Sequence, residues 1–109
     1  MPWLVREGEV LAVAEVARTR RKRRRGLLGR DRIDGVLVLR PCRHVHTIAM
    51  RFPIDVAFCN REGTVVRTCC LRPWRVAPIV LRSSFVIEAA SGAFERWRLR
   101  VGDVIEITE

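Results

Sequence analysis

No apolar run in the chain approaches the roughly 20 residues that a membrane-spanning helix requires, so the sequence predicts no membrane span. The first residues, Met-Pro-Trp-Leu-Val-Arg-Glu-Gly-Glu, place acids where a signal peptide needs an uninterrupted apolar stretch. We therefore predict a cytoplasmic protein without an export signal. In that compartment the four cysteines are expected to be reduced thiols.

Several enzyme and metal-site motifs are also missing. The chain has no Cys-x-x-Cys pair, no serine in a nucleophile-elbow motif and no glycine-rich phosphate loop. These absences remove the usual zinc-knuckle, thioredoxin, hydrolase and nucleotide-binding interpretations. We predict no cofactor and no metal site, and we favour a non-enzymatic role.

The composition is that of a single globular domain. The chain has 109 residues, of which 49% are hydrophobic and 30% charged. A chain of this length buries roughly 65% of the surface that its unfolded form exposes, enough for a real core. We predict one domain over residues 1–109.

The patterning predicts a mainly β (α+β) protein. Short alternating segments separated by glycine and proline dominate, and Asn60–Gly63 reads as a hairpin connection. We expect an antiparallel, jelly-roll-like sandwich or barrel with two short peripheral helices. Strands are expected at 7–16, 36–39, 43–50, 54–59, 64–71, 84–89 and 104–108, and helices at 20–28 (with Thr19 as N-cap) and 91–98.

One central block makes the chain recognisable. Met50-Arg-Phe-Pro-Ile-Asp55, preceded by His46-Thr47 and followed by Phe58 and Gly63, resembles the domain of unknown function 192 family of bacteria and archaea. Further similarities, which extend the resemblance over nearly the whole chain, are Gly26-Leu27-Leu28-Gly29-Arg30, Glu88, Gly92 and Gly102-Asp103.

The resemblance implies a mostly β fold and no known activity. Many relatives look exported, whereas this chain lacks the signal. It departs from the family at Leu28, where methionine is usual, and at Asn60, where aspartate is common. The largest departure is the helix after Thr19, which is usually mixed in charge and here is almost purely basic.

Asp55 suggests a polar pocket. It lies on the strand face opposite Ile54, Val56 and Phe58, and an acid there is costly to bury unless it is paired. His46 and Asp55 could act as an acid–base pair. Alternatively, Asp55 fastens the kink at Pro53 or the loop at Trp74, and this structural role is favoured. The candidate pocket comprises His46, Met50, Asp55, Trp74, Arg75 and Glu88.

A second candidate site is Cys42, His44 and His46. On one strand these three side chains would share a face and could ligate zinc or copper. The Cys-x-His-x-His spacing is only weak evidence for a metal site, and no fourth ligand is identifiable. Pro41 could also start the strand late and so take Cys42 out of alignment with the two histidines. We favour a buried cysteine with one exposed and one hydrogen-bonded histidine, without a metal.

The net charge of +9 is concentrated in one segment. An anion-binding surface is predicted there, with nucleic acid as the obvious polyanion, because like charges on one short helix repel until an anion relieves them. Side chains that would read bases are missing. The alternative, a solvated arginine-rich surface, is modestly favoured. The residues are Arg18, Arg20, Arg21, Lys22, Arg23, Arg24 and Arg25.

Three functions therefore remain open. The first is a binding or accessory module that recognises an unknown small ligand or protein near His46 and Asp55. The second is binding of nucleic acid or an anionic surface through the basic helix. The third is a metal-dependent or acid–base enzyme. The oligomeric state is not readable from the sequence.

Overall fold

A computed structural model describes residues 2–108 and contains seven strands and two short helices. The prediction of a mainly β fold with two short helices is thereby confirmed. In chain order the elements are β1 (Trp3–Arg6), β2 (Glu9–Ala17), α1 (Arg20–Arg25), β3 (Val36–Leu39), β4 (Ile54–Cys59), β5 (Val65–Leu71), β6 (Phe85–Ala90), α2 (Ala93–Trp97) and β7 (Ile105–Thr108).

The strands form one bent sheet in the order β5-β4-β6-β3-β2-β1-β7. All neighbours pair antiparallel except β2 and β3, which are parallel. The sheet is not closed, but its two edges meet at an isolated bridge between Thr64 and Val104. No helix within residues 2–108 is long and apolar enough to cross a bilayer.

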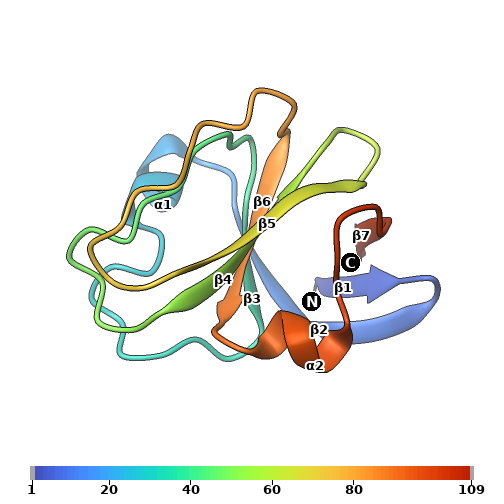
Figure 1. Cartoon of the computed structure of the whole chain (residues 1–109), viewed down its shortest axis with the longest axis horizontal. Coiled ribbons are helices and arrows are strands. Elements are labelled where there is room, and N and C mark those ends of the chain that lie inside the picture. The colour runs from blue at the N-terminus through green and yellow to red at the C-terminus, as the bar shows by residue number, and fades with distance from the viewer. Residues whose placement is uncertain (1, 109) are drawn as a thin grey trace.

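Alternating side chains divide the core between the two faces of the sheet. One cluster, which includes Ala57, Cys59 and Ile87, packs against α2 and Leu99. The other, which includes Ile54, Val56 and Val86, is covered by Leu27, Val45, Met50 and Ala77 from the connections. Figure 1 shows α1 and the long connections on one side of the molecule and β1 and β7 on the other.

The predicted strand at 43–50 is wrong. The segment makes only an isolated bridge, from His46 to Val76, although it runs antiparallel to residues 75–80 through several backbone hydrogen bonds. Pro78 in the facing segment has no N–H to donate, and Ala49 has a φ of +65° that ends any extended run. Cys42, His44 and His46 therefore do not share a strand face.

Two smaller predictions also need correction. The strand predicted at 7–16 is the second half of a hairpin, since Glu7 and Gly8, both with positive φ, turn the chain between β1 and β2. The helix predicted at 20–28 ends at Arg25, where Gly26 caps it with a φ of +49°. Thr19 is the N-cap as predicted, and its side chain accepts a hydrogen bond from the backbone N–H of Lys22.

The connections that cover the sheet are held together by Thr47. This side chain is completely buried, and its Oγ1 donates to the carbonyl of Arg72 at 2.5 Å and accepts from the N–H of Arg75 at 2.9 Å. Its backbone carbonyl accepts a further hydrogen bond from the N–H of Trp74 at 2.8 Å. Segments 43–50 and 72–82 consequently form one layer over the sheet.

Candidate functional site

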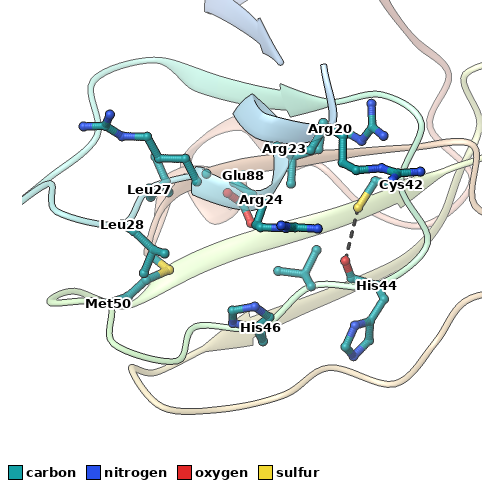
Figure 2. Close-up of a pocket in the computed structure, with 14 residues that line it drawn as sticks. Arg20, Arg23, Arg24, Leu27, Leu28, Cys42, His44, His46, Met50 and Glu88 are labelled. Carbon is teal, nitrogen blue, oxygen red and sulfur yellow. Dashed lines mark hydrogen bonds between the residues drawn. The ribbon is translucent and has the colours of Figure 1, made fainter. Parts of the chain in front are cut away.

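A cleft of about 300 Å³ opens between α1 and segment 42–50, and we call it the α1 cleft. Its volume is at the lower end of the range for small-molecule sites. Figure 2 shows the arginines projecting from α1 on one side of the cleft and the two histidines on the other. The lining residues are Arg20, Arg23, Arg24, Arg25, Gly26, Leu27, Leu28, Leu39, Cys42, His44, Val45, His46, Met50 and Glu88.

Glu88 forms the floor of the cleft. Its position on β6 is opposite Leu37 on one neighbouring strand and Val56 on the other, and both of these side chains are buried. The residue is only 3% exposed, and no group within residues 2–108 hydrogen-bonds its carboxylate. Burial raises its pKa to about 7, against a small lowering by the charge of Arg30.

The first wall of the cleft is α1. All six of its residues are cationic and none is buried. Arg23 is fixed by hydrogen bonds from its guanidinium to the carbonyls of Arg18 and Arg40. Arg20 and Arg24 are exposed, and none of the ion pairs found within residues 2–108 involves them. Their charges are therefore free to meet an anion at the mouth of the cleft.

The opposite wall carries Cys42, His44 and His46. The Cys42 thiol donates to the carbonyl of His44 at 3.1 Å, and burial raises its pKa. Nδ1 of His46 accepts a hydrogen bond from the N–H of Ile48 at 3.2 Å, so only the other ring nitrogen remains for a ligand. In the described part of the chain, no three His, Cys, Asp or Glu side chains are grouped so that they could hold a metal ion.

The interior of the cleft between these walls is apolar. Leu27, Val45 and Met50 are buried, and Leu28 is partly buried beside them. Figure 2 places Leu28 and Met50 at the end of the cleft away from Cys42. A ligand that fits would have an acidic group at the arginines, an apolar body and a polar group that reaches Glu88.

The structure combines two sites that the sequence presents as separate. From the predicted pocket, His46, Met50 and Glu88 line the α1 cleft together with Arg20, Arg23, Arg24 and Arg25 of the predicted anion-binding surface. The other members of that surface, Arg18, Arg21 and Lys22, are exposed beside α1 or on it and do not line the cleft.

Three residues of the predicted pocket lie elsewhere. Asp55 points to the opposite face of the sheet, where its Oδ2 accepts hydrogen bonds from the N–H groups of Gly92 and Phe94 at the start of α2. Trp74 and Arg75 lie in the outer layer and are exposed. His46 and Asp55 are consequently not brought together.

The sequence did not predict that Leu27 and Leu28 contribute to the apolar interior of the cleft. Leu27 and Leu28 follow α1 and turn back toward the sheet after the cap at Gly26, which only the three-dimensional structure reveals. Glu88 itself had a signal in the sequence, because it is an acid in an otherwise apolar strand, Phe85-Val-Ile-Glu-Ala-Ala90.

Comparison with known proteins gives a family without an assigned activity. The DUF192 family model, described as Uncharacterized ACR, matches residues 4–107. A UPF0127 protein of Pyrococcus abyssi is 37% identical over 62 residues, which are 57% of this chain and 53% of that protein. A UPF0127 protein of Pyrococcus furiosus is 36% identical over a match of the same extent. The match thus spans about half the length of these relatives.

Two solved structures share the fold. A protein of unknown function from Novosphingobium aromaticivorans aligns with a TM-score of 0.82 at 19% identity, covering 96% of this chain and 82% of that one. A protein of Sinorhizobium meliloti, described as a proposed transcription regulator, aligns with a TM-score of 0.80 at 22% identity, covering 96% and 90%. At these identities the likeness concerns the fold alone.

Proposed function

The chain belongs to the DUF192 family, and we propose that it is a binding module which holds a small anionic molecule in the α1 cleft. The ligand class is an amphipathic acid, with a phosphate or carboxylate group, an apolar body and a polar group that reaches Glu88. This proposal unites the pocket and the anion-binding surface that the sequence predicts.

The observation that carries the proposal is the buried Glu88 carboxyl group without a hydrogen-bond partner. Burial disfavours the charged form of this carboxyl and raises its pKa, so a ligand group that hydrogen-bonds it would be favoured. Every side-chain nitrogen or oxygen in residues 2–108 that is sealed from solvent has a partner, so the Glu88 carboxyl retains access through the cleft. A ligand with a hydroxyl, amine or carbonyl group at this point would satisfy it.

The cationic side chains at the mouth of the α1 cleft favour an anionic group on the ligand. Arg20 and Arg24 are exposed guanidinium groups that can bind phosphate or carboxylate in a bidentate manner. Leu27, Leu28 and Met50 line the same cleft as these arginines and Glu88. An inorganic anion alone would leave that apolar interior and Glu88 unused, which favours an amphipathic molecule.

Binding explains the cleft better than catalysis does. The acid–base pair considered from the sequence is divided between the two faces of the sheet, since Asp55 accepts hydrogen bonds from Gly92 and Phe94. Cys42, the cysteine in the cleft lining, has its thiol pKa raised by burial, which disfavours the nucleophilic thiolate.

Calorimetric titration with three probes tests the proposal. Phenyl phosphate has both the acid and the apolar body, inorganic phosphate has only the acid, and benzyl alcohol has only the apolar body and a hydroxyl. We expect phenyl phosphate to bind more tightly than either partial probe. The variant Arg20→Ser/Arg24→Ser should weaken its binding by about tenfold or more, since a charge-assisted hydrogen bond contributes about 1.5–3 kcal/mol.

The matched control removes two arginines outside the cleft. Arg61 and Arg100 are exposed and do not line the cleft, so Arg61→Ser/Arg100→Ser has the same net charge as the cleft variant. Equal losses in both variants would mean that the basic protein attracts anions without a site, and the proposal would be wrong. Equal affinity for phenyl phosphate and inorganic phosphate would also contradict it.

Nucleic-acid binding through Arg18–Arg25 remains a second prediction. The exposed side chains of Arg20, Arg21, Arg24 and Arg25 favour it, because phosphate contacts need accessible cations. The test is a salt titration of binding to random duplex and single-stranded DNA. Affinity unchanged after replacement of Arg20, Arg21, Arg23 and Arg24 with serine would rule it out.

A further inference from the structure

Segment 72–82 exposes an unusual amount of apolar surface. Among the described residues, the four most exposed large hydrophobic side chains all belong to it, and the partly exposed Ile48 lies in the facing segment. Leu81 is 78% exposed, Ile79 65%, Trp74 64% and Val76 59%. Apolar side chains concentrated in this way mark interaction sites rather than ordinary protein surface.

These side chains are presented on a fixed platform. The N–H of Ala77 donates to the carbonyl of Val45 at 2.9 Å, and the N–H of Val80 donates to that of Arg43, also at 2.9 Å. Ala77 is buried in the core beneath. Since the backbone is bonded at Ala77 and Val80, the intervening Ile79 is held at the surface, and Leu81 follows directly after Val80.

The same layer is positively charged and free of acids. No acidic residue occurs between Asp34 and Asp55, or between Glu62 and Glu88. Exposed arginines accompany the apolar side chains at positions 43, 72, 75 and 82. Within residues 2–108, no ion pair neutralises any of these four.

We propose that this surface, formed by segments 43–48 and 72–82, docks on an anionic lipid bilayer. Trp74, Ile79 and Leu81 enter the boundary between headgroups and acyl chains, while the arginines contact lipid phosphates. Peripheral membrane segments combine these same features, with Trp and aliphatic residues for the apolar phase and Arg or Lys for anionic lipids.

The mixture of side chains distinguishes a membrane from other anionic partners. Nucleic acid would pair with the arginines but would offer no apolar phase for Ile79 and Leu81. A second copy of this chain would place one acid-free, cationic surface against another, which like charges oppose. A bilayer that contains anionic lipids satisfies both the apolar side chains and the arginines.

Vesicle co-sedimentation tests the proposal. The probes are vesicles of phosphatidylcholine alone and of phosphatidylcholine with phosphatidylglycerol, at 150 mM salt (about 8 Å of screening length). We expect partition onto the mixed vesicles only. The variant Ile79→Ser/Leu81→Ser should reduce the partition coefficient by about tenfold or more, through loss of two apolar anchors. The control, Val101→Ser/Val104→Ser, removes two exposed valines beside β7 and should leave it unchanged.

A second measurement locates the contact. Lipids brominated near the top of the acyl chain should quench the part of the wild-type tryptophan emission that Trp74→Phe removes. The proposal is wrong if the mixed vesicles bind no protein, if both serine variants partition equally well, or if Trp74 stays unquenched. Self-association that Ile79→Ser/Leu81→Ser abolishes, without vesicle binding by the wild type, would assign the surface to a second copy. Phenyl phosphate binding should be unaffected by this variant, so the two proposals fail separately.

Discussion

The carboxylate of Asp55 accepts a hydrogen bond from the backbone N–H of Gly92 at 3.0 Å, which fastens the start of α2 to strand β4. A second bond, from the N–H of Phe94 at 3.1 Å, reaches the same oxygen. Gly92 itself has a φ of +94° and no side chain that could cap the helix. The acid that the sequence offered as half of an acid–base pair therefore replaces a missing helix cap.

Replacing Asp55 with alanine should destabilise the protein without affecting the α1 cleft. The change leaves two N–H groups without their acceptor, at a cost of about 2–3 kcal/mol in the free energy of unfolding. Urea unfolding measures the loss, and Asp55→Asn, which retains an acceptor oxygen, should lose less. Phenyl phosphate affinity of the folded Asp55→Asn variant should equal that of the wild type. A selective loss of affinity would instead place Asp55 in the site.

The stability of the protein should depend on pH through Glu88. In the unfolded chain the carboxyl has its ordinary pKa of 4.5, whereas burial raises it to about 7 in the folded protein. The folded state therefore binds the proton more tightly, and stability falls as the pH rises from 4.5 through 7. Glu88→Gln should match the wild type below pH 4.5 and exceed it above pH 7 by about 3 kcal/mol.

Urea unfolding of Glu88→Gln at pH 5 and pH 8 measures this difference. Glu106→Gln serves as the control, because Glu106 is exposed on β7 and should give equal stability changes at both pH values. A Glu88→Gln protein that is destabilised equally at pH 5 and pH 8 would mean that the carboxylate has a stabilising partner in solution. Such a result would contradict the proposal that Glu88 binds the ligand.

The fold was largely predictable because local patterns determine it. Alternation predicted the strands at 54–59 and 84–89, and Gly63 marked the hairpin connection. Segment 43–50 was not predictable in this way. Its Val45 and Met50 are buried like strand residues, yet Thr47 bonds to the loop at Arg72 and Arg75 in place of a strand partner. Tertiary contacts therefore decide the conformation of this segment, and the periodicity of the sequence carries no information about them.

The candidate site was less predictable than the fold. Glu88 and His46 are far apart in sequence and were named only as members of a loose set. Their common location depends on the turn after Gly26, which brings Leu27 and Leu28 over the sheet. Asp55 and Glu88 were both mid-strand acids, and what separates their roles is the strand face, since only Asp55 faces the N–H groups of α2.

Gly63 should be far less tolerant of alanine than Gly8, although both have positive φ. A Cβ at Gly63 would lie 2.2 Å from the carbonyl oxygen of Ile105, whereas one at Gly8 would have nothing within 4 Å. Gly8→Ala should cost only the left-handed backbone penalty of about 1–2 kcal/mol. Gly63→Ala should cost several kcal/mol more or prevent folding, because it pushes apart the contact between the two sheet edges. Thermal unfolding of the pair measures the difference, and equal losses would contradict the close approach.

The four cysteines should react with a thiol reagent in an order that reflects their surroundings. Cys70 is exposed, Cys42 and Cys69 are half-buried with raised thiol pKa, and burial raises the pKa of Cys59 to about 12. Because the thiolate is the reactive form, Cys70 should be modified first and Cys59 only after unfolding. Mass spectrometry of peptides taken at successive times identifies each modified site.

Ligand protection then connects this order to the α1 cleft. Cys42 lines the cleft, whereas Cys70 lies on the edge strand β5, where its Sγ is 3.5 Å from Oγ of Ser91. Saturating phenyl phosphate should slow modification of Cys42 severalfold and leave Cys70 unchanged, so that Cys70 acts as the internal control. Protection should be weaker in Arg20→Ser/Arg24→Ser at a phenyl phosphate concentration that just saturates the wild type, because this variant binds the phosphate less tightly. Equal protection of both cysteines would indicate general stabilisation of the fold, and no protection of either would place the probe outside the cleft.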